Sequence, residues 1–173
     1  FAGHGYVVNG KHLLLTPEAD SNLINHGFEA VSVDVLRDAT EVKGVDRVFI
    51  LDACRTDVFA DRGISEGLQD DSHFRDIVGG KKPYSGSFSL LWSCGKGQKA
   101  CELPKRRQGL FTAALLDVLD DYSKKGIEAR IDDVLMESLS THMSEIAIAE
   151  GMSTEQHPGR VYEGSVPVIL DGI

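Results

Sequence analysis

The stretch Val45-Asp46-Arg47-Val48-Phe49-Ile50-Leu51-Asp52 (VDRVFILD) is the clearest strand signal in the sequence. Its residues 48–51 are all apolar and include β-branched side chains, a pattern typical of a central strand that is covered on both faces. Strands of this type belong to parallel sheets flanked by helices. The stretch therefore predicts an α/β fold with a largely parallel sheet.

The segments on either side of this strand alternate between strands and helices, which supports the same fold class. Residues 1–5 resemble the tail of a strand that enters a tight turn, and residues 55–86 are expected to form a long polar loop with a helical turn near 74–78. The other predicted strands are 12–15, ended by Thr16-Pro17, then 88–92 and 166–170. The predicted helices are 32–42, capped by Ser32, then 110–122 and 131–149, ended by Gly151. Their predicted apolar faces are Val35, Leu36 and Ala39; Leu110, Phe111, Ala114, Leu115, Val118 and Leu119; and Val134, Leu135, Leu139, Met143 and Ile146.

Length and composition narrow the function classes. The 173 residues are one domain's worth of chain, and the net charge of −9 argues against direct binding of nucleic acid. The sequence shows neither an apolar run long enough to span a membrane nor a secretion signal. Three cysteines without CxxC spacing fit a reducing compartment. We therefore expect a cytoplasmic protein that binds no membrane.

The opening of the sequence indicates that a larger domain extends beyond it. A strand end needs the rest of its strand and its neighbours, whereas residues 1–5 begin abruptly. We expect residues 1–173 to be the C-terminal part of a longer domain, with the first strands elsewhere. A trimmed chain explains the same observation equally well.

Two residues with catalytic chemistry are expected at strand ends. His4 follows the opening strand and Cys54 follows VDRVFILD, fifty positions later. Reactive groups in open α/β sheets collect beyond the carboxyl ends of the strands, and a crossover connection could place these two side by side. A thiol beside an imidazole is the arrangement that nucleophilic catalysis requires. The alternative is a small buried thiol and a structural histidine.

Several motifs resemble caspase-like cysteine peptidases, including bacterial metacaspase-like and paracaspase proteins. The motifs are FAGHGY at 1–6, LDACR at 51–55, GQKACE at 97–102 with GLFT at 109–112, and QHP at 156–158. Caspases also carry their histidine about fifty residues before the cysteine. The resemblance implies a three-layer α/β/α sandwich and a Cys–His dyad. His4 would be the general acid/base, Cys54 the nucleophile, and the backbone amides of Gly5 and Cys54 the oxyanion hole.

One position departs from caspases and changes the implied specificity. Caspases have Gln two residues before the nucleophile, and here that residue is Asp52. A carboxylate in the S1 pocket favours Arg, and less so Lys, at P1, and Glu102 resembles the second acid that paracaspases place there. The substrate would then be a protein or peptide with a basic P1 residue. The alternatives are a carboxylate that caps backbone amides for Asp52 and a solvated charge for Glu102.

The resemblance also raises the question of activation. Many metacaspases are activated by Ca²⁺, but the positions of Asp20, Asp34 and Asp61 match that pattern poorly. We therefore predict no cofactor and no metal site, and Ca²⁺ activation stays open as an alternative. We expect an activating partner, or an N-terminal segment of the same protein. Lys81-Lys82 and Lys105-Arg106-Arg107 would be self-processing sites of a peptidase with basic specificity, or simply solvated loops.

The remaining cysteines and histidines carry no motif. Cys94 and Cys101 lack zinc-like spacing and are expected to be ordinary buried thiols. No partner motif accompanies the other histidines: His12, His26, His73, His142 and His157. Two alternatives to an endopeptidase stay open: a non-catalytic signalling or scaffold module of the same shape, and a thiol hydrolase that acts on a non-peptide amide.

Overall fold

A four-stranded sheet forms the centre of the computed structural model, which describes residues 1–8, 11–16, 30–57, 86–153, 155–164 and 169–170. Its strands, in spatial order, are β1 (Ala2–Gly3), β5 (Arg47–Ala53), β7 (Phe88–Trp92) and β11 (Gly159–Glu163). The first three run parallel, and β11 is antiparallel to β7. The predicted strand at VDRVFILD is thus confirmed, and it begins two residues later than expected.

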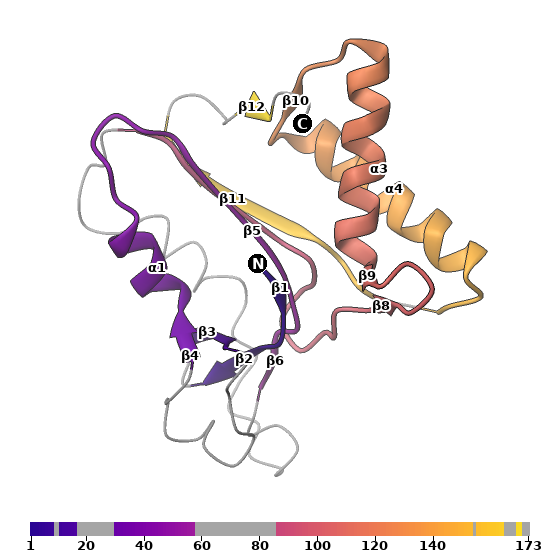
Figure 1. The fold of residues 1–173 in the computed structure, drawn as a ribbon, viewed down its shortest axis with the longest axis horizontal. Helices are drawn as coiled ribbons and strands as arrows, with labels where there is room; N and C mark the ends of the chain where they lie inside the picture. The colour runs from indigo at the N-terminus through magenta and orange to yellow at the C-terminus, as the bar shows by residue number, and fades with distance from the viewer. Residues whose placement is uncertain (9–10, 17–29, 58–85, 154, 165–168, 171–173) are drawn as a thin grey trace.

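Helices cover both faces of this sheet, as Figure 1 shows, with α1 on one side and α3 and α4 on the other. The alternation along β5 explains this, because Leu51 and Ala53 join the core on the α1 side while Ile50 packs against the α3–α4 core. In β7, Leu91 belongs to the α3–α4 core and its neighbour Leu90 to the other. The three-layer α/β/α sandwich expected from the sequence is therefore confirmed.

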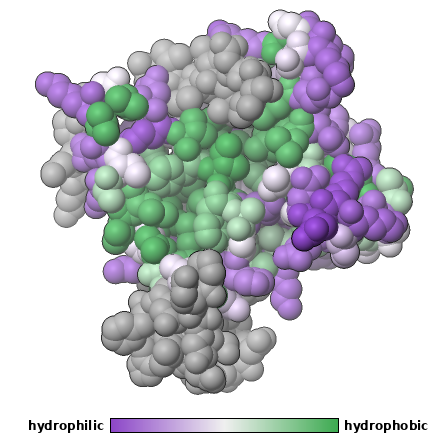
Figure 2. All heavy atoms as spheres, viewed as in Figure 1, coloured by the Kyte–Doolittle hydropathy of each residue, from purple (hydrophilic) through white to green (hydrophobic). Residues whose placement is uncertain are grey.

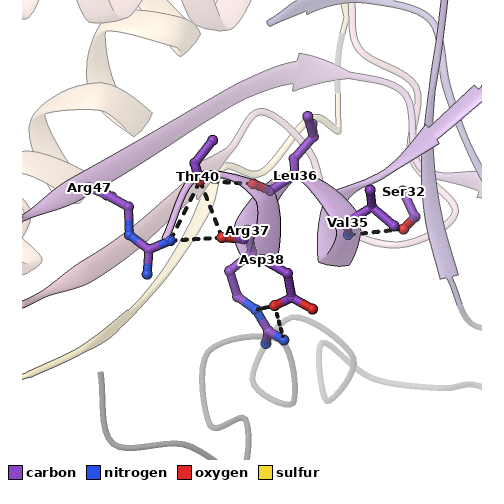
Figure 3. Close-up of polar contacts among 7 residues, drawn as sticks. All are labelled: Ser32, Val35, Leu36, Arg37, Asp38, Thr40 and Arg47. Atoms are coloured by element: carbon purple, nitrogen blue, oxygen red, sulfur yellow. Dashed lines mark hydrogen bonds and ion pairs between the residues drawn. The ribbon is translucent and has the colours of Figure 1, made fainter. Parts of the chain in front are cut away.

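Helix α1 (Val33–Ala39) begins at Ser32, as predicted, because the Ser32 hydroxyl oxygen accepts a hydrogen bond from the N–H of Val35 at 3.2 Å (Figure 3). The helix ends at Ala39, three residues before the predicted Val42. Its buried residue is Val33, whereas Val35 is 59% exposed and Ala39 is exposed as well. The predicted apolar face was wrong at Val35 and Ala39, because the helix turns Val33 toward the sheet.

The end of α1 is tied to the start of β5 (Figure 3). Arg47 donates from Nη1 to the carbonyl oxygen of Arg37 at 2.7 Å and to Thr40 Oγ1 at 3.5 Å. A cation beside the last carbonyls of a helix offsets the partial negative charge that collects there. The same guanidinium lies 5.3 Å from the ring centroid of Phe88 on β7. Arg47 thus joins α1, β5 and β7 at the end of the sheet away from Cys54.

The other face carries α3 (Leu110–Lys125) and α4 (Asp133–Ala149). Gly126 ends α3 in the left-handed conformation at φ 65°, and Asp132 caps α4 by accepting from the N–H of Leu135 at 3.0 Å. Most predicted apolar positions are buried between these helices and the sheet. Val134 is the exception, since it is 64% exposed on the outer side of α4.

The last strand of the central sheet differs from the prediction. Residues 159–163 form β11 and pair with β7, whereas the predicted strand at 166–170 contributes only β12 (Ile169–Leu170), which pairs with β10 (Ala129–Arg130) in a separate ribbon. Residues 165–168 lie outside the described residues. The sequence GRVYE alternates too weakly for its pairing to be recognised locally.

A second sheet lies at the carboxyl end of the first. Its order is β4 (Ala30–Ser32), β3 (Lys11–Leu15), β2 (Gly5–Val8) and β6 (Thr56–Asp57). Strand β3 confirms the prediction at 12–15. A short hairpin of β8 (Glu102–Leu103) and β9 (Gln108–Gly109) precedes α3. The predicted helical turn at 74–78 lies outside the described residues.

Among the described residues, one edge of strand β5 is only partly paired. Its neighbour β1 is registered only with Asp52 and Ala53, and beyond that the N-terminal ammonium of Phe1 donates to the carbonyl oxygen of Ile50 at 2.9 Å. Figure 2 shows the side of the molecule that faces the viewer in Figure 1. Apolar side chains gather in the middle of this side, over the region of β1 and β5.

Within the described ranges, no helix is both long enough and apolar enough to cross a membrane.

Candidate active site

His4 and Cys54 lie opposite each other on two chain segments that run side by side. Strand β1 pairs in parallel with β5 through Ala2–Asp52 and Gly3–Ala53, and His4 and Cys54 are the next residue of each segment. Parallel pairing then resumes between β2 and β6 through Tyr6–Thr56. The fifty-position offset is the same before and after the gap, and neighbouring strands are about 4.8 Å apart. The backbone therefore places His4 beside Cys54 where the central sheet ends.

Both residues are accessible from solvent. His4 is exposed, and Cys54 is a free, half-buried thiol. The carbonyl oxygen of His4 accepts from the N–H of Leu15 at 3.0 Å, which anchors the turn to β3.

Gly5 is required because two backbones approach each other closely there. A Cβ at this position would lie 2.8 Å from the carbonyl oxygen of Cys54 and 3.0 Å from the Cβ of Ala53. The Nε2 atom of the buried His12 would lie 3.1 Å away on the β3 side. Glycine lets the segment after His4 stay close to the segment after Cys54, next to the expected oxyanion hole.

Asp52 is buried against the start of α3. Only 5% of the residue is exposed, and its Oδ2 accepts hydrogen bonds from Thr112 N at 3.1 Å and from Thr112 Oγ1 at 2.5 Å. Helix α3 begins after Gly109, which has no side chain to cap the helix, so Asp52 supplies the missing acceptor from β5. The alternative that the Asp52 carboxylate caps a backbone amide therefore holds for its Oδ2 atom. The other oxygen, Oδ1, is buried and has no hydrogen-bond partner among the described residues.

Glu102 reaches the same region from the β8–β9 hairpin. It is exposed and is registered opposite Gly109. The Asp52 carboxylate packs directly on Gly109, where a Cβ would lie only 2.0 Å from Oδ2. The structure therefore brings both predicted acids, Asp52 and Glu102, next to Gly109. Asp52 stands two residues before Cys54 along the chain.

The segment that follows Cys54 is fixed by a residue that sequence reasoning missed. Arg55 is 3% exposed, and its guanidinium lies 5.6 Å from the ring centroid of Trp92. Its N–H donates to the carbonyl oxygen of Gln98 at 3.2 Å, and its own carbonyl accepts from the N–H of Gly97 at 2.9 Å. The sequence shows that Arg55 directly follows Cys54, but it does not show that Arg55 is buried.

Two glutamines hold the loop after β7 to the chain before β11. Gln98 accepts at Oε1 from the N–H groups of Gly95 and His157. Gln156 accepts from the N–H of Cys101 at 2.8 Å and donates to the carbonyl oxygen of Ser93 at 2.9 Å. These bonds shape the loop that contacts Arg55. Both glutamines stand in motifs quoted for the family resemblance, which was the only sequence signal for them.

Cys94 is fully buried beside the site. Its Sγ donates to the carbonyl oxygens of Ala53 at 3.2 Å and Gln98 at 3.5 Å. Burial raises the pKa of this thiol to about 11, and the neighbouring Cys54 adds to the increase. Cys94 is therefore the ordinary buried thiol that the sequence predicted, and it is protonated at neutral pH.

The other candidate residues lie apart from this site or outside the described residues. Asp34 is in the first turn of α1, and no cluster of three or more metal-ligating side chains occurs in the part of the chain that the structure describes. His142 donates from Nδ1 to the carbonyl oxygen of Ser138 at 2.9 Å, and His157 is exposed. Five singled-out segments or residues lie outside the described residues: Asp20, His26, Asp61, His73 and Lys81-Lys82. In the basic turn, Lys105 pairs with Glu150 and Arg106 with Asp117.

Comparisons with known proteins identify a family. A model of the caspase domain of C14 peptidases matches residues 1–161. No curated protein matches the chain. Among solved structures, the chain resembles a Geobacter sulfurreducens protein determined as a structural-genomics target, with 17% identity and a TM-score of 0.49. The match covers 95% of this chain and 64% of that protein, so this chain spans less than two thirds of its length.

Proposed function

The chain belongs to the caspase-domain family, and on that premise we propose that it is a cysteine endopeptidase that cleaves after a basic P1 residue. The observation that carries the proposal is the parallel register that sets His4 opposite Cys54. This juxtaposition supports the assignment of Cys54 as nucleophile and of His4 as proton carrier.

The proposed reaction has two steps. His4 takes the proton of the Cys54 thiol, the sulfur attacks the scissile carbonyl carbon, and the negative charge on the carbonyl oxygen is stabilised by the N–H groups of Gly5 and Cys54. The C–N bond then breaks, the leaving amine takes a proton from the His4 imidazole, and an acyl-enzyme remains. In the second step His4 takes a proton from water, and the oxygen of that water attacks the thioester carbon. The C–S bond then breaks, the sulfur takes the proton back from His4, and the free thiol and the carboxylic acid product remain.

The proposed specificity follows from Asp52 and Glu102. The buried Oδ1 of Asp52 has no hydrogen-bond partner among the described residues, and a buried carboxylate oxygen without a partner costs about 1–3 kcal/mol. A guanidinium can make a charge-assisted hydrogen bond to that oxygen, with Glu102 as a second acid nearby. Arginine should therefore be favoured over lysine, whose ammonium cannot bridge two acids in a plane.

The test is cleavage of a fluorogenic peptide with Arg at P1. We expect activity that is lost in Cys54→Ala and retained in the matched control Cys101→Ala, which removes the other partly buried free thiol. Assays with and without Ca²⁺ examine the alternative of Ca²⁺ activation, and an activating partner or N-terminal segment belongs to the proposal. If wild type and Cys54→Ala are equally inactive in every condition, the non-catalytic scaffold alternative takes its place.

A further inference from the structure

The Asp52 carboxylate is held asymmetrically. Both hydrogen bonds from Thr112 go to Oδ2, and the O–H···O distance of 2.5 Å is typical of a charge-assisted bond. Gly109 packs against the same oxygen. The two oxygens of a carboxylate are chemically equivalent, so this environment decides which one faces the helix and which one remains for another ligand.

We propose that Thr112 is a positioning residue for substrate specificity: its hydroxyl fixes Asp52 so that Oδ1 is presented to the cation of the P1 side chain. The inference rests on the proposed function and deepens it. Thr112 itself does not contact the substrate in this proposal, because it acts through Asp52.

The position of Thr112 in α3 explains why its hydroxyl matters. It is the third residue of the helix, so its backbone N–H is one of the donors that no helix carbonyl accepts. That N–H alone would hold Asp52 at 3.1 Å and allow the carboxylate to rotate. The hydroxyl adds a second donor to the same oxygen and prevents that rotation. It also keeps Oδ2 against the positive end of α3, where a bound cation would be repelled.

The test compares two peptidyl electrophiles that differ only at P1, one with arginine and one with its neutral isostere citrulline. Their rates of Cys54 labelling, measured by intact-protein mass spectrometry, give an arginine-to-citrulline ratio. Thr112→Val removes the hydroxyl but keeps the shape and the backbone N–H. We expect this ratio to fall about tenfold in Thr112→Val, the effect of losing one hydrogen bond to a charged group. Thr112→Ser should restore it to within about threefold.

A matched control separates specificity from folding. Thr40→Val removes a hydroxyl that donates to the carbonyl oxygen of Leu36 at the end of α1, far from Cys54 along the sheet, and should keep the wild-type ratio. Labelling of Cys54 with iodoacetamide, which needs no S1 pocket, should proceed at the wild-type rate in Thr112→Val. A purely structural role would instead slow all three reagents together.

Three results would count against the inference, and a fourth against its premise. An unchanged ratio in folded Thr112→Val, or equal slowing with every reagent, overturns the positioning role. If Thr112→Val does not fold, Thr112→Ala repeats the test without a β-branched side chain, and failure of both to fold shows that the hydroxyl is structural. A wild-type protein that labels with both electrophiles at one rate refutes the proposed basic specificity itself.

Discussion

Replacing Gly109 by alanine should disrupt the contact between Asp52 and α3. The new Cβ would lie 2.0 Å from Asp52 Oδ2 and 2.7 Å from Cγ, whereas ordinary contacts begin near 3.4 Å. The backbone at Gly109 has φ −70°, which alanine adopts without strain, so the clash with Asp52 should be the main cause of the effect. Because this oxygen also holds both bonds from Thr112, the carboxylate cannot move away without breaking them.

The expected cost follows from these contacts. Overpacking typically costs about 1–3 kcal/mol, and lost hydrogen bonds to a charged group cost a similar amount. We expect Gly109→Ala to lower the free energy of unfolding by about 3 kcal/mol. Urea unfolding followed by fluorescence of Trp92, the only tryptophan of the sequence, measures the loss.

A double-mutant cycle identifies the cause. In an Asp52→Ala background the clash is absent, so Gly109→Ala should cost only about 1 kcal/mol, the usual disadvantage of alanine at a helix N-cap. The coupling between the two sites should thus be about 2 kcal/mol. Equal costs of Gly109→Ala in both backgrounds would refute the reasoning, because the alanine would then act through something other than Asp52.

Two further predictions concern Cys94 and Ser32. The unfolded chain releases the Cys94 proton at its ordinary pKa of 9.0, but the folded chain only near 11, so stability should fall as the pH rises from about 9 to about 11. Relative to Cys94→Ala, the wild type should lose about 3 kcal/mol over this range, and parallel pH profiles would contradict the assignment. Ser32→Ala should cost about 1 kcal/mol through loss of the α1 cap, as measured by urea unfolding. Ser144→Ala, which removes a hydroxyl bonded to the carbonyl oxygen of Ser140 within α4, should cost less than about half of that, and an equal loss in both would argue against the cap.

The elements that sequence reasoning found are those whose signal is local. The apolar run of β5, the periodicity of α3 and the capping serine of α1 each depend on neighbouring residues, and all three are confirmed. The errors concern orientation and distant pairing. Val35 and Val134 were predicted to lie on apolar faces but are exposed. The sequence pattern left the buried face of each helix ambiguous, and the contacts of the helix with the sheet decide which face is buried.

Strand β11 shows what a local signal cannot supply. Gly159 is registered opposite Trp92, and a Cβ there would lie 2.4 Å from the indole ring. A glycine is therefore needed at this position to leave room for the Trp92 side chain of β7. That requirement is visible only once the two strands are paired. The sequence GRVYE therefore gave no reason to choose it over residues 166–170.

The candidate site divides in the same way. The placement of His4 and Cys54 at adjacent strand ends could be predicted, because parallel strands bring their carboxyl ends to one edge. The bonds between Asp52 and Thr112 could not, since they join residues sixty positions apart. Nothing in the sequence GLFT indicates that its threonine serves a carboxylate on a distant strand.

The first turn of α3 is capped by Asp52, which comes from β5, and this has a consequence for the order of folding. The C-terminal end of this helix carries its own stop signal in Gly126, so that end can form early from local interactions alone. The first turn has to wait until Asp52 arrives from β5. We therefore expect φ-values near zero at Thr112 and higher values toward Tyr122, because the bonds between Asp52 and Thr112 would form only after the transition state for folding.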